Sequence, residues 1–177
     1  MGRRGLKRMI DRRRAREGSA AIEFAMVALP FFFMMFAVLE LALVFLIDSV
    51  LENAAIETGR LVRTGQADAQ EFNAATFKSN LCNRMSIFSS DCSSKVMVDV
   101  RPIPQFSNPN VPDPLGGQAF DPNTLGYDGG APGDIMLVRA WYQYTLLTPF
   151  LAQGLSKLSN GKAVLTATTA FRNEPYD

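Results

Sequence analysis

The hydrophobic and polar positions divide the chain into one long apolar stretch followed by shorter patterned segments. Residues 24–39 carry no charged side chain, and no Lys or Arg occurs between Arg16 and Arg60. A helix over residues 24–47 would be about 36 Å long at ~1.5 Å per residue, enough to cross a hydrocarbon core of ~30 Å. Because apolar residues fall on every face of this helix, the pattern predicts a transmembrane span rather than a surface helix.

Beyond Ile47 the apolar positions become one-sided. The apolar or small residues that recur at helical spacing are Val50, Leu51, Ala54, Ala55, Thr58, Leu61 and Val62. The polar residues that face away from them are Glu52, Asn53, Glu57, Arg60 and Arg63. We therefore expect the same helix to continue, to rest its apolar side on a globular domain, and to stop at Thr64-Gly65.

Further along, the pattern predicts a second helix and three strands. Asp68 and Glu71 have capping-box spacing, and the buried stripe of the helix would be Phe77, Leu81, Met85 and Phe88. Strands are expected over residues 95–101, 135–147 and 163–171, with Val96, Val98 and Val100 on one face of the first. The predicted fold class is α+β, with a long N-terminal helix that continues into a small domain containing a short antiparallel sheet.

A loop separates the first two strands. Residues 102–133 contain seven Pro and six Gly, which excludes a helix or a central strand there. Its neighbourhood holds Asp113, Asp121, Asp128 and Asp134 without EF-hand spacing. We favour solvated turn residues for these acids, with calcium ligands as the alternative.

Charge is distributed unevenly along the chain. Residues 1–17 hold eight basic and two acidic side chains, whereas the remainder holds ten basic and fifteen acidic ones. A short basic tail beside a span stays in the cytoplasm, so residues 1–18 are expected inside, 19–47 in the membrane and 48–177 outside. This positive-inside pattern explains the basic block without nucleic-acid binding.

An ordinary cleaved signal peptide fits poorly. Its apolar region would run ~7–15 residues, and no small-x-small cleavage site follows Ile47. A retained anchor is the better interpretation, and a plain signal anchor with a stray glutamate near its cytoplasmic end is the alternative.

The basic leader, Gly18, and Glu23-Phe24 opening an apolar helix resemble the prepilin-peptidase signal of type IV pilins. Further stretches narrow the resemblance to the TadE-like pseudopilins, or minor pilins, of the Tad/Flp pilus system. These stretches are Ala21-Ile-Glu-Phe-Ala25, Pro30-Phe31, Glu52-Asn-Ala-Ala55, Gly59-Arg60, Arg63-Thr-Gly-Gln66 and the closing Phe171-Arg-Asn-Glu-Pro-Tyr176.

The resemblance implies a processing site and an assembly residue. The peptidase would cut between Gly18 and Ser19 on the cytoplasmic side, leaving Glu23 as the fifth mature residue, with Phe24 beside it. In such pilins this glutamate is thought to meet the N-terminal amine of a neighbouring subunit, which would offset the cost of a carboxylate in lipid. Solvation of Glu23 at the headgroups is the alternative. The implied partners are the lipid bilayer of the bacterial inner membrane, a prepilin peptidase, and other pilins and assembly proteins of the Tad pilus.

Two more residues of the span invite interpretation. Glu40 would lie near the far interface, either as an assembly contact or simply solvated by snorkelling. Pro30 removes a backbone donor, so a kink or local melting is expected, whether functional or merely tolerated.

Cys82 and Cys92 would lie in the oxidising space outside the membrane, where a pair usually forms a disulfide. A metal site is not expected, because the cysteine spacing is wrong and the chain has no histidine.

No catalytic arrangement is recognisable. Without histidine there is no Ser-His-Asp or Cys-His pair, and no phosphate-binding or dinucleotide glycine motif occurs. We expect neither enzymatic activity nor a cofactor. Two alternatives to a pilus assembly protein are a signal-anchored binding or sensor module whose leader is not cleaved, and an anchored hydrolase that uses carboxylates.

Overall fold

The computed structural model describes residues 3–116, 119–156 and 158–176, and the side chains from residue 19 onward. The helices are α1 (Arg3–Arg63), α2 (Gln66–Ala69), α3 (Ala74–Arg84), α4 (Ser89–Lys95) and α5 (Pro149–Leu155), with 3-10 turns η1 (Ser86–Phe88) and η2 (Pro122–Thr124). The strands are β1 (Val96–Pro102), β2 (Ile135–Thr145) and β3 (Lys162–Arg172). This is the expected α+β composition.

The chain divides into two compact units, one ending at Leu41 and one beginning at Ala42. In the first unit, the large apolar side chains from Ile22 to Leu39 are exposed on all sides of α1. Within the described residues, Ser19–Arg63 is the one helix long and apolar enough to cross a membrane, with a mean hydropathy of 2.5 in its most apolar window. The helix runs through Pro30 without interruption, so the local melting considered there does not occur.

In the second unit, the remainder of α1 is one-sided, as predicted. Its buried positions are Val44, Ile47, Leu51, Ala54, Ala55, Thr58 and Val62, and its exposed ones include Glu52, Asn53, Glu57, Arg60 and Arg63. Thr58 is accommodated in the core because its hydroxyl donates to the Ala54 carbonyl at 2.7 Å. The helix ends at Arg63, and Gly65 follows in the left-handed region with φ 72°.

The three strands form one antiparallel sheet in the order β1-β2-β3. Val96, Val98 and Val100 pair with Tyr142, Ala140 and Val138, and these six residues are 8% exposed or less. Thr169 of β3 pairs with Val138 and approaches Gly59 of α1, so this face of the sheet lies against α1.

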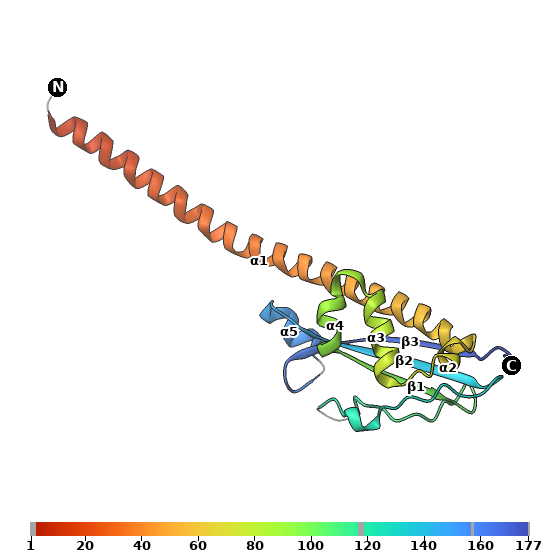
Figure 1. Ribbon diagram of the computed structural model, residues 1–177. Helices are drawn as coiled ribbons and strands as arrows, with labels where there is room; N and C mark the ends of the chain where they lie inside the picture. The colour runs from red at the N-terminus through yellow and green to blue at the C-terminus, as the bar shows by residue number, and fades with distance from the viewer. Residues whose placement is uncertain (1–2, 117–118, 157, 177) are drawn as a thin grey trace. The chain divides into compact units, whose positions relative to one another are not determined.

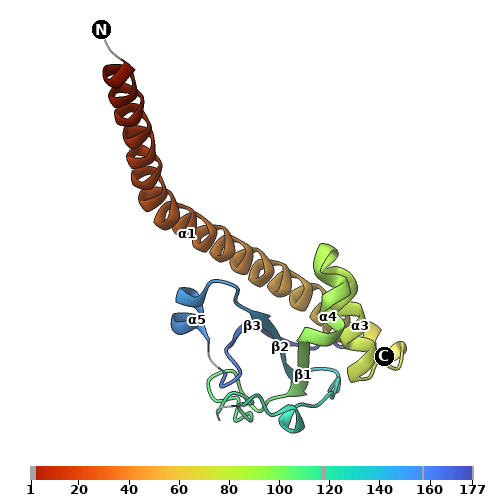
Figure 2. The same cartoon turned by 90° about the vertical axis from the view of Figure 1, so that its left-hand side faces the viewer.

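The opposite face is covered by the long loop rather than by helices. Trp141, Leu158 and Val164 form its buried core, against which Leu115, Phe120 and Leu125 pack. The second unit thus has three layers, with helices, sheet and loop in that order (Figures 1 and 2). The predicted irregular loop is confirmed between β1 and β2, apart from the short turn η2 and a parallel bridge between Tyr127 of the loop and Val100 of β1.

The prediction of a capping box at Asp68 and Glu71 was wrong. Asp68 lies inside the one-turn helix α2, and Glu71 adopts a positive φ of 51° after it. The helix that carries the buried stripe begins later, where Asn73 accepts hydrogen bonds from the backbone N–H groups of Ala75 and Thr76 at 2.9 and 3.0 Å. A single Asn at the N-cap satisfies the first-turn donors that the Asp–Glu pair was expected to serve.

The predicted stripe is only partly buried. Phe77, Leu81 and Met85 are 0% exposed. Phe88, in contrast, lies in η1 after α3 has ended, because Ser86 takes a positive φ of 53° and breaks the helical spacing. Phe88 is consequently half-buried.

Two short helices were not predicted. Residues 89–95 form α4 directly before β1, and residues 149–155 form α5, where Thr148-Pro149 starts a helix with proline in its first turn. Strand β2 therefore ends at Thr145, two residues earlier than predicted.

Candidate functional site

The N-terminal residues singled out by sequence lie together on α1. Gly18 and Ser19 are helical, and the Ser19 hydroxyl donates to the Glu23 carboxylate at 3.0 Å, with both side chains exposed. Phe24 is 71% exposed. The carboxylate of Glu23 and the ring of Phe24 are thus available to another molecule.

Glu40, further along the same helix, is different. Its side chain is buried, with 7% exposed, and it takes part in at least one interaction. The structure therefore does not bring the two carboxylates of the apolar segment into one site.

Cys82 of α3 and Cys92 of α4 form a disulfide, as predicted. Their Cα atoms are 5.5 Å apart, and the two residues are 7% and 0% exposed. The bond closes the α3–η1–α4 turn and so fixes the entry into β1.

The C-terminal segment fastens the end of α1 to the loop. The backbone N–H of Glu174 donates to the Arg63 carbonyl at 2.8 Å, and the Arg63 and Glu174 side chains form an exposed ion pair at 3.1 Å. Asn173, 2% exposed, donates from its amide to the Gly129 and Ala131 carbonyls at 3.0 and 3.2 Å. This gives a physical role to the closing Phe171–Tyr176 motif, for which sequence offered none.

Two glycines, one within α1 and one just after its end, leave room for the C-terminal segment to pack against the helix. A Cβ on Gly59 would lie 3.0 Å from the Phe171 ring, and a Cβ on Gly65 would lie 2.5 Å from the Tyr176 ring. Gly65 also needs its positive φ of 72° to turn the chain out of α1. The Gly59-Arg60 and Arg63-Thr-Gly-Gln66 stretches are therefore the receiving surface for the tail.

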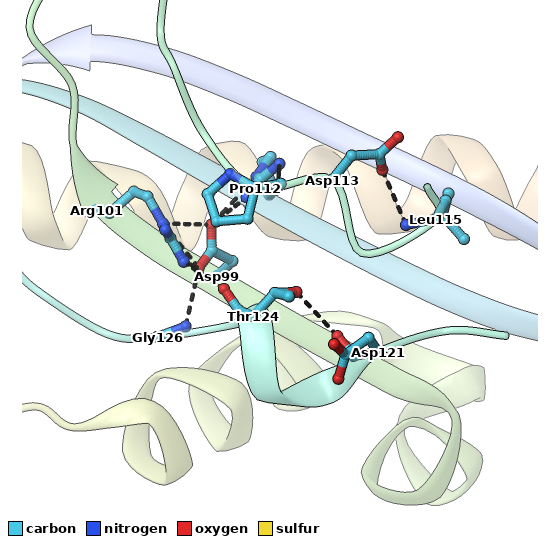
Figure 3. A network of polar contacts seen from close by, with 9 residues as sticks. Asp99, Arg101, Pro112, Asp113, Leu115, Asp121, Thr124 and Gly126 are labelled. Carbon is cyan, nitrogen blue, oxygen red and sulfur yellow. Dashed lines mark hydrogen bonds and ion pairs between the residues drawn. The ribbon is translucent and has the colours of Figure 1, made fainter. Parts of the chain in front are cut away.

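A buried ionic cluster lies on the loop-covered face of the sheet. Asp99, 0% exposed, accepts from the Arg139 guanidinium at 2.7 and 3.1 Å, from Arg101, and from the Gly126 backbone N–H at 2.9 Å. Asp99 and Arg139 are direct cross-strand partners in β1 and β2. Figure 3 shows the carboxylate of Asp99 enclosed between Arg101 and the loop backbone.

The two arginines extend the cluster into the loop. Arg101 donates to the Thr124 carbonyl at 2.8 Å, and Arg139 donates to the Pro112 carbonyl at 2.9 Å. The Arg139 guanidinium also lies 4.9 Å from the centre of the Trp141 ring, a cation–π geometry. Sequence reasoning missed this cluster, although an Asp between two buried valines of a strand was a signal that could have found it.

A pocket of about 390 Å³ lies at the end of the second unit where α1 stops. Its lining includes Tyr127 and Tyr176 and the carboxylates of Asp68, Glu71 and Asp128. Burial, followed by the nearby charges of Asp68 and Asp128, raises the pKa of Tyr127 to about 12. Burial also raises the pKa of Tyr176, so both phenols are neutral at physiological pH.

The acids of the loop mainly serve as turn residues, as we favoured. Asp113, Asp121 and Asp128 accept from the backbone N–H two residues onward, each at 2.9 Å, and Asp134 accepts from Ala131 at 2.8 Å. Within the described part of the chain, no group of three or more acidic or cysteine side chains is placed to hold a metal ion.

Comparison with known families identifies one relationship. A sequence model of the TadE-like protein family matches residues 18–60, a range that begins at Gly18 and contains Glu23, Phe24 and Glu40. No curated protein and no solved structure matches the chain. The predicted resemblance to the TadE-like family is thus confirmed over residues 18–60, which are less than half of the chain. The tail and the motifs beyond Arg60 lie outside the matched range.

We predict that Gly65→Ala destabilises the second unit by about 1–3 kcal/mol, because alanine would have to adopt a left-handed backbone and displace Tyr176. Urea unfolding of the full chain in detergent, followed by the fluorescence of its single tryptophan, measures this. Gly154→Ala is the matched control, because Gly154 lies in α5 with nothing within 4 Å of a Cβ. If both variants unfold at the same urea concentration, the tail does not require glycine at position 65.

We also predict that Asp99→Asn lowers the free energy of unfolding by about 3–5 kcal/mol, since it leaves the buried Arg139 guanidinium and the partly buried Arg101 guanidinium without their counter-charge. The same urea titration reports the loss. Asp91→Asn breaks the exposed Asp91–Lys95 pair and should cost no more than about 1 kcal/mol. Equal effects of the two substitutions would contradict a structural role for the buried cluster.

Proposed function

We propose that the chain is a TadE-like pseudopilin, a membrane-anchored structural protein that takes part in assembly of the Tad/Flp pilus. The observation that carries this proposal is the family match, which starts at the glycine of the leader motif and covers the whole apolar part of α1. The exposed apolar side chains on every face of that segment support an anchor, because they would be costly to leave in water.

The proposed topology places the N-terminus in the cytoplasm and the domain after residue 48 outside the inner membrane. Its support is the excess of eight basic over two acidic side chains in residues 1–17. The disulfide between Cys82 and Cys92 suits an oxidising compartment, and so agrees with an extracytoplasmic position for the domain.

Processing would occur between Gly18 and Ser19 by a prepilin peptidase. Cleavage would remove the leader and create an α-amino group on Ser19, with a reference pKa of ~7.7–8.0 that keeps it mostly charged at neutral pH. Glu23, exposed and only one helical turn from Ser19, would then offer its carboxylate to the amine of a neighbouring subunit. Pairing would relieve the cost of a carboxylate in lipid only after assembly, and so favour the assembled state.

The role proposed is structural rather than enzymatic, with other pilins and assembly proteins of the Tad system as partners. One observation favours the second candidate, a signal-anchored binding module. The pocket lined by Tyr127, Tyr176 and three carboxylates has the composition of a site for an organic cation. Leader cleavage separates the two candidates, because the binding module would keep its leader.

The first test concerns processing. Gly18→Leu should leave the precursor uncut, because the peptidase is expected to recognise the small residue on the leader side of the bond. Intact-mass spectrometry of the membrane-extracted protein, from cells with an active pilus peptidase, distinguishes the two forms. Gly5→Leu, a glycine inside the leader, should be cut normally. Finding residues 1–18 still attached to the unchanged protein would refute the pseudopilin proposal.

The second test separates assembly from processing. Glu23→Gln keeps the shape of the side chain but cannot form an ion pair with an amine. We expect normal cleavage and membrane insertion, and at least several-fold fewer surface pili when the variant is the only copy of the gene. Glu52→Gln, on the exposed side of α1 in the second unit, is the control and should leave pili unchanged. Wild-type pilus numbers with Glu23→Gln would show that Glu23 is merely solvated.

A further inference from the structure

The segment that joins β2 to β3 exposes a group of large apolar side chains. Leu147 is 82% exposed, Phe150 70% and Leu155 40%, while Leu151 is buried at 9% and holds α5 to the domain. No charged residue occurs from Leu146 to Ser156. Exposed apolar residues gathered on one short, uncharged segment are typical of an interaction surface rather than of scattered surface leucines.

The sheet register fixes where this segment lies in the second unit. Ile135 and Arg172 pair at one end of the β2–β3 ladder, and Thr145 and Lys162 pair at the other. The first end lies at the close of α1, because the Glu174 N–H bonds to the Arg63 carbonyl. Helix α5 connects the strands at the second end, away from α2 and the C-terminus (Figures 1 and 2).

That second end is where α1 enters the unit. From Phe171, which packs against Gly59, back to Lys162, β3 covers about 30 Å at ~3.3 Å per residue. The same distance along α1, at ~1.5 Å per residue, leads back from Gly59 to the beginning of the second unit near Ala42. The apolar surface on α5 therefore lies at the end of the second unit at which α1 enters it.

The strands that α5 joins, and the segment between them, carry no acidic side chain. No acidic residue occurs between Asp134 and Glu174, and Lys157 and Lys162 follow α5 in the sequence. The pocket at the other end is lined by Asp68, Glu71 and Asp128. An apolar segment followed by lysines suits the headgroup region, which accepts apolar rings and offers phosphate to ammonium groups.

We propose that α5 is a second membrane contact, with Leu147 and Phe150 inserted at the outer surface of the bilayer. This proposal rests on the membrane anchoring of α1 in the proposed function. It adds that the head is held against the lipid surface by a site far from the span in sequence. Release of α5 from lipid would then accompany movement of the subunit out of the membrane.

The experiment uses the full chain in proteoliposomes, with one new tryptophan per variant at an exposed apolar position. Phe150→Trp probes α5, and the emission of the unchanged chain, which has only the buried Trp141, is subtracted as background. Lipids brominated near the headgroup should quench the new tryptophan at least twofold more strongly than lipids brominated near the chain ends. Leu147→Trp repeats the measurement at a second exposed position, should Phe150→Trp fold poorly.

Two controls make the outcome decisive. The first control is Phe106→Trp, because the native Phe106 side chain is 57% exposed. Phe106 follows Ile103, whose N–H bonds to the Ile135 carbonyl at the opposite end of the sheet. A tryptophan at position 106 should therefore not be quenched. The second control is Phe33→Trp, which lies in the proposed span and should be quenched by lipids brominated near the chain ends.

The possible outcomes separate the two proposals. If Phe33→Trp is quenched and Phe150→Trp behaves like Phe106→Trp, the α5 contact is refuted while the anchor stands. If Phe33→Trp is not quenched either, the anchor itself fails. Blue-shifted emission of Phe150→Trp without quenching would mean that a second protein copy covers α5, which also overturns the proposal.

Discussion

The whole second unit depends on how the two faces of a three-stranded sheet are kept from water. One face is covered by helices, because α1 has its apolar residues on one side after Ala42. On that side, Leu51, Ala55 and Val62 are buried against the domain. The other face has an irregular loop, in which only scattered backbone groups form hydrogen bonds and no regular helix or strand ladder satisfies the rest. Asp99 resolves this problem by placing charge-assisted hydrogen bonds beneath the loop, which are stronger and more directional than contacts between apolar groups.

The same cluster explains why a loop rich in proline and glycine is held in place. Among its fixed points are the carbonyls of Pro112 and Thr124 and the N–H of Gly126, each bonded to the Asp99–Arg101–Arg139 group. The apolar contacts of Leu115, Phe120 and Leu125 with the Trp141 core lie beside these points. Desolvation makes such a cluster costly, so its value lies less in net stability than in selecting one loop arrangement among many.

The sequence predicted the elements that have a recognisable hydrophobic pattern along one segment. It missed the features that depend on a contact between residues far apart in the chain. The apolar run and the one-sided continuation of α1 were recognisable from their hydrophobic pattern, whereas β2, buried at nearly every position, was recognisable from its aromatic and β-branched residues. The N-cap of α3 was predicted too early in the sequence, because both Asp68 and Asn73 are residue types that commonly begin a helix. Asn73 is the actual cap, since the backbone turns at Glu71 and separates α2 from α3. The tail was recognised as a motif, but its reason required knowing that Gly65 and Tyr176, far apart in sequence, are in contact. Glu23 and Gly18 were singled out by family resemblance alone, because the processing and assembly steps proposed for them involve other molecules and leave no trace in the packing of one chain.

The polar contacts of the second unit also determine how rigid it is. The tail ties Arg63, the last residue of α1, to the loop through Glu174 and Asn173, and the loop is tied to the sheet through Asp99. Helix α1, the loop and the sheet are therefore linked in series by polar contacts of fixed geometry, and the disulfide joins helices α3 and α4. A unit built in this way transmits a displacement of α1 as a rigid body, because packed interiors deform little. That rigidity means that α1 from Ala42 to Arg63 and the rest of the second unit move as one piece.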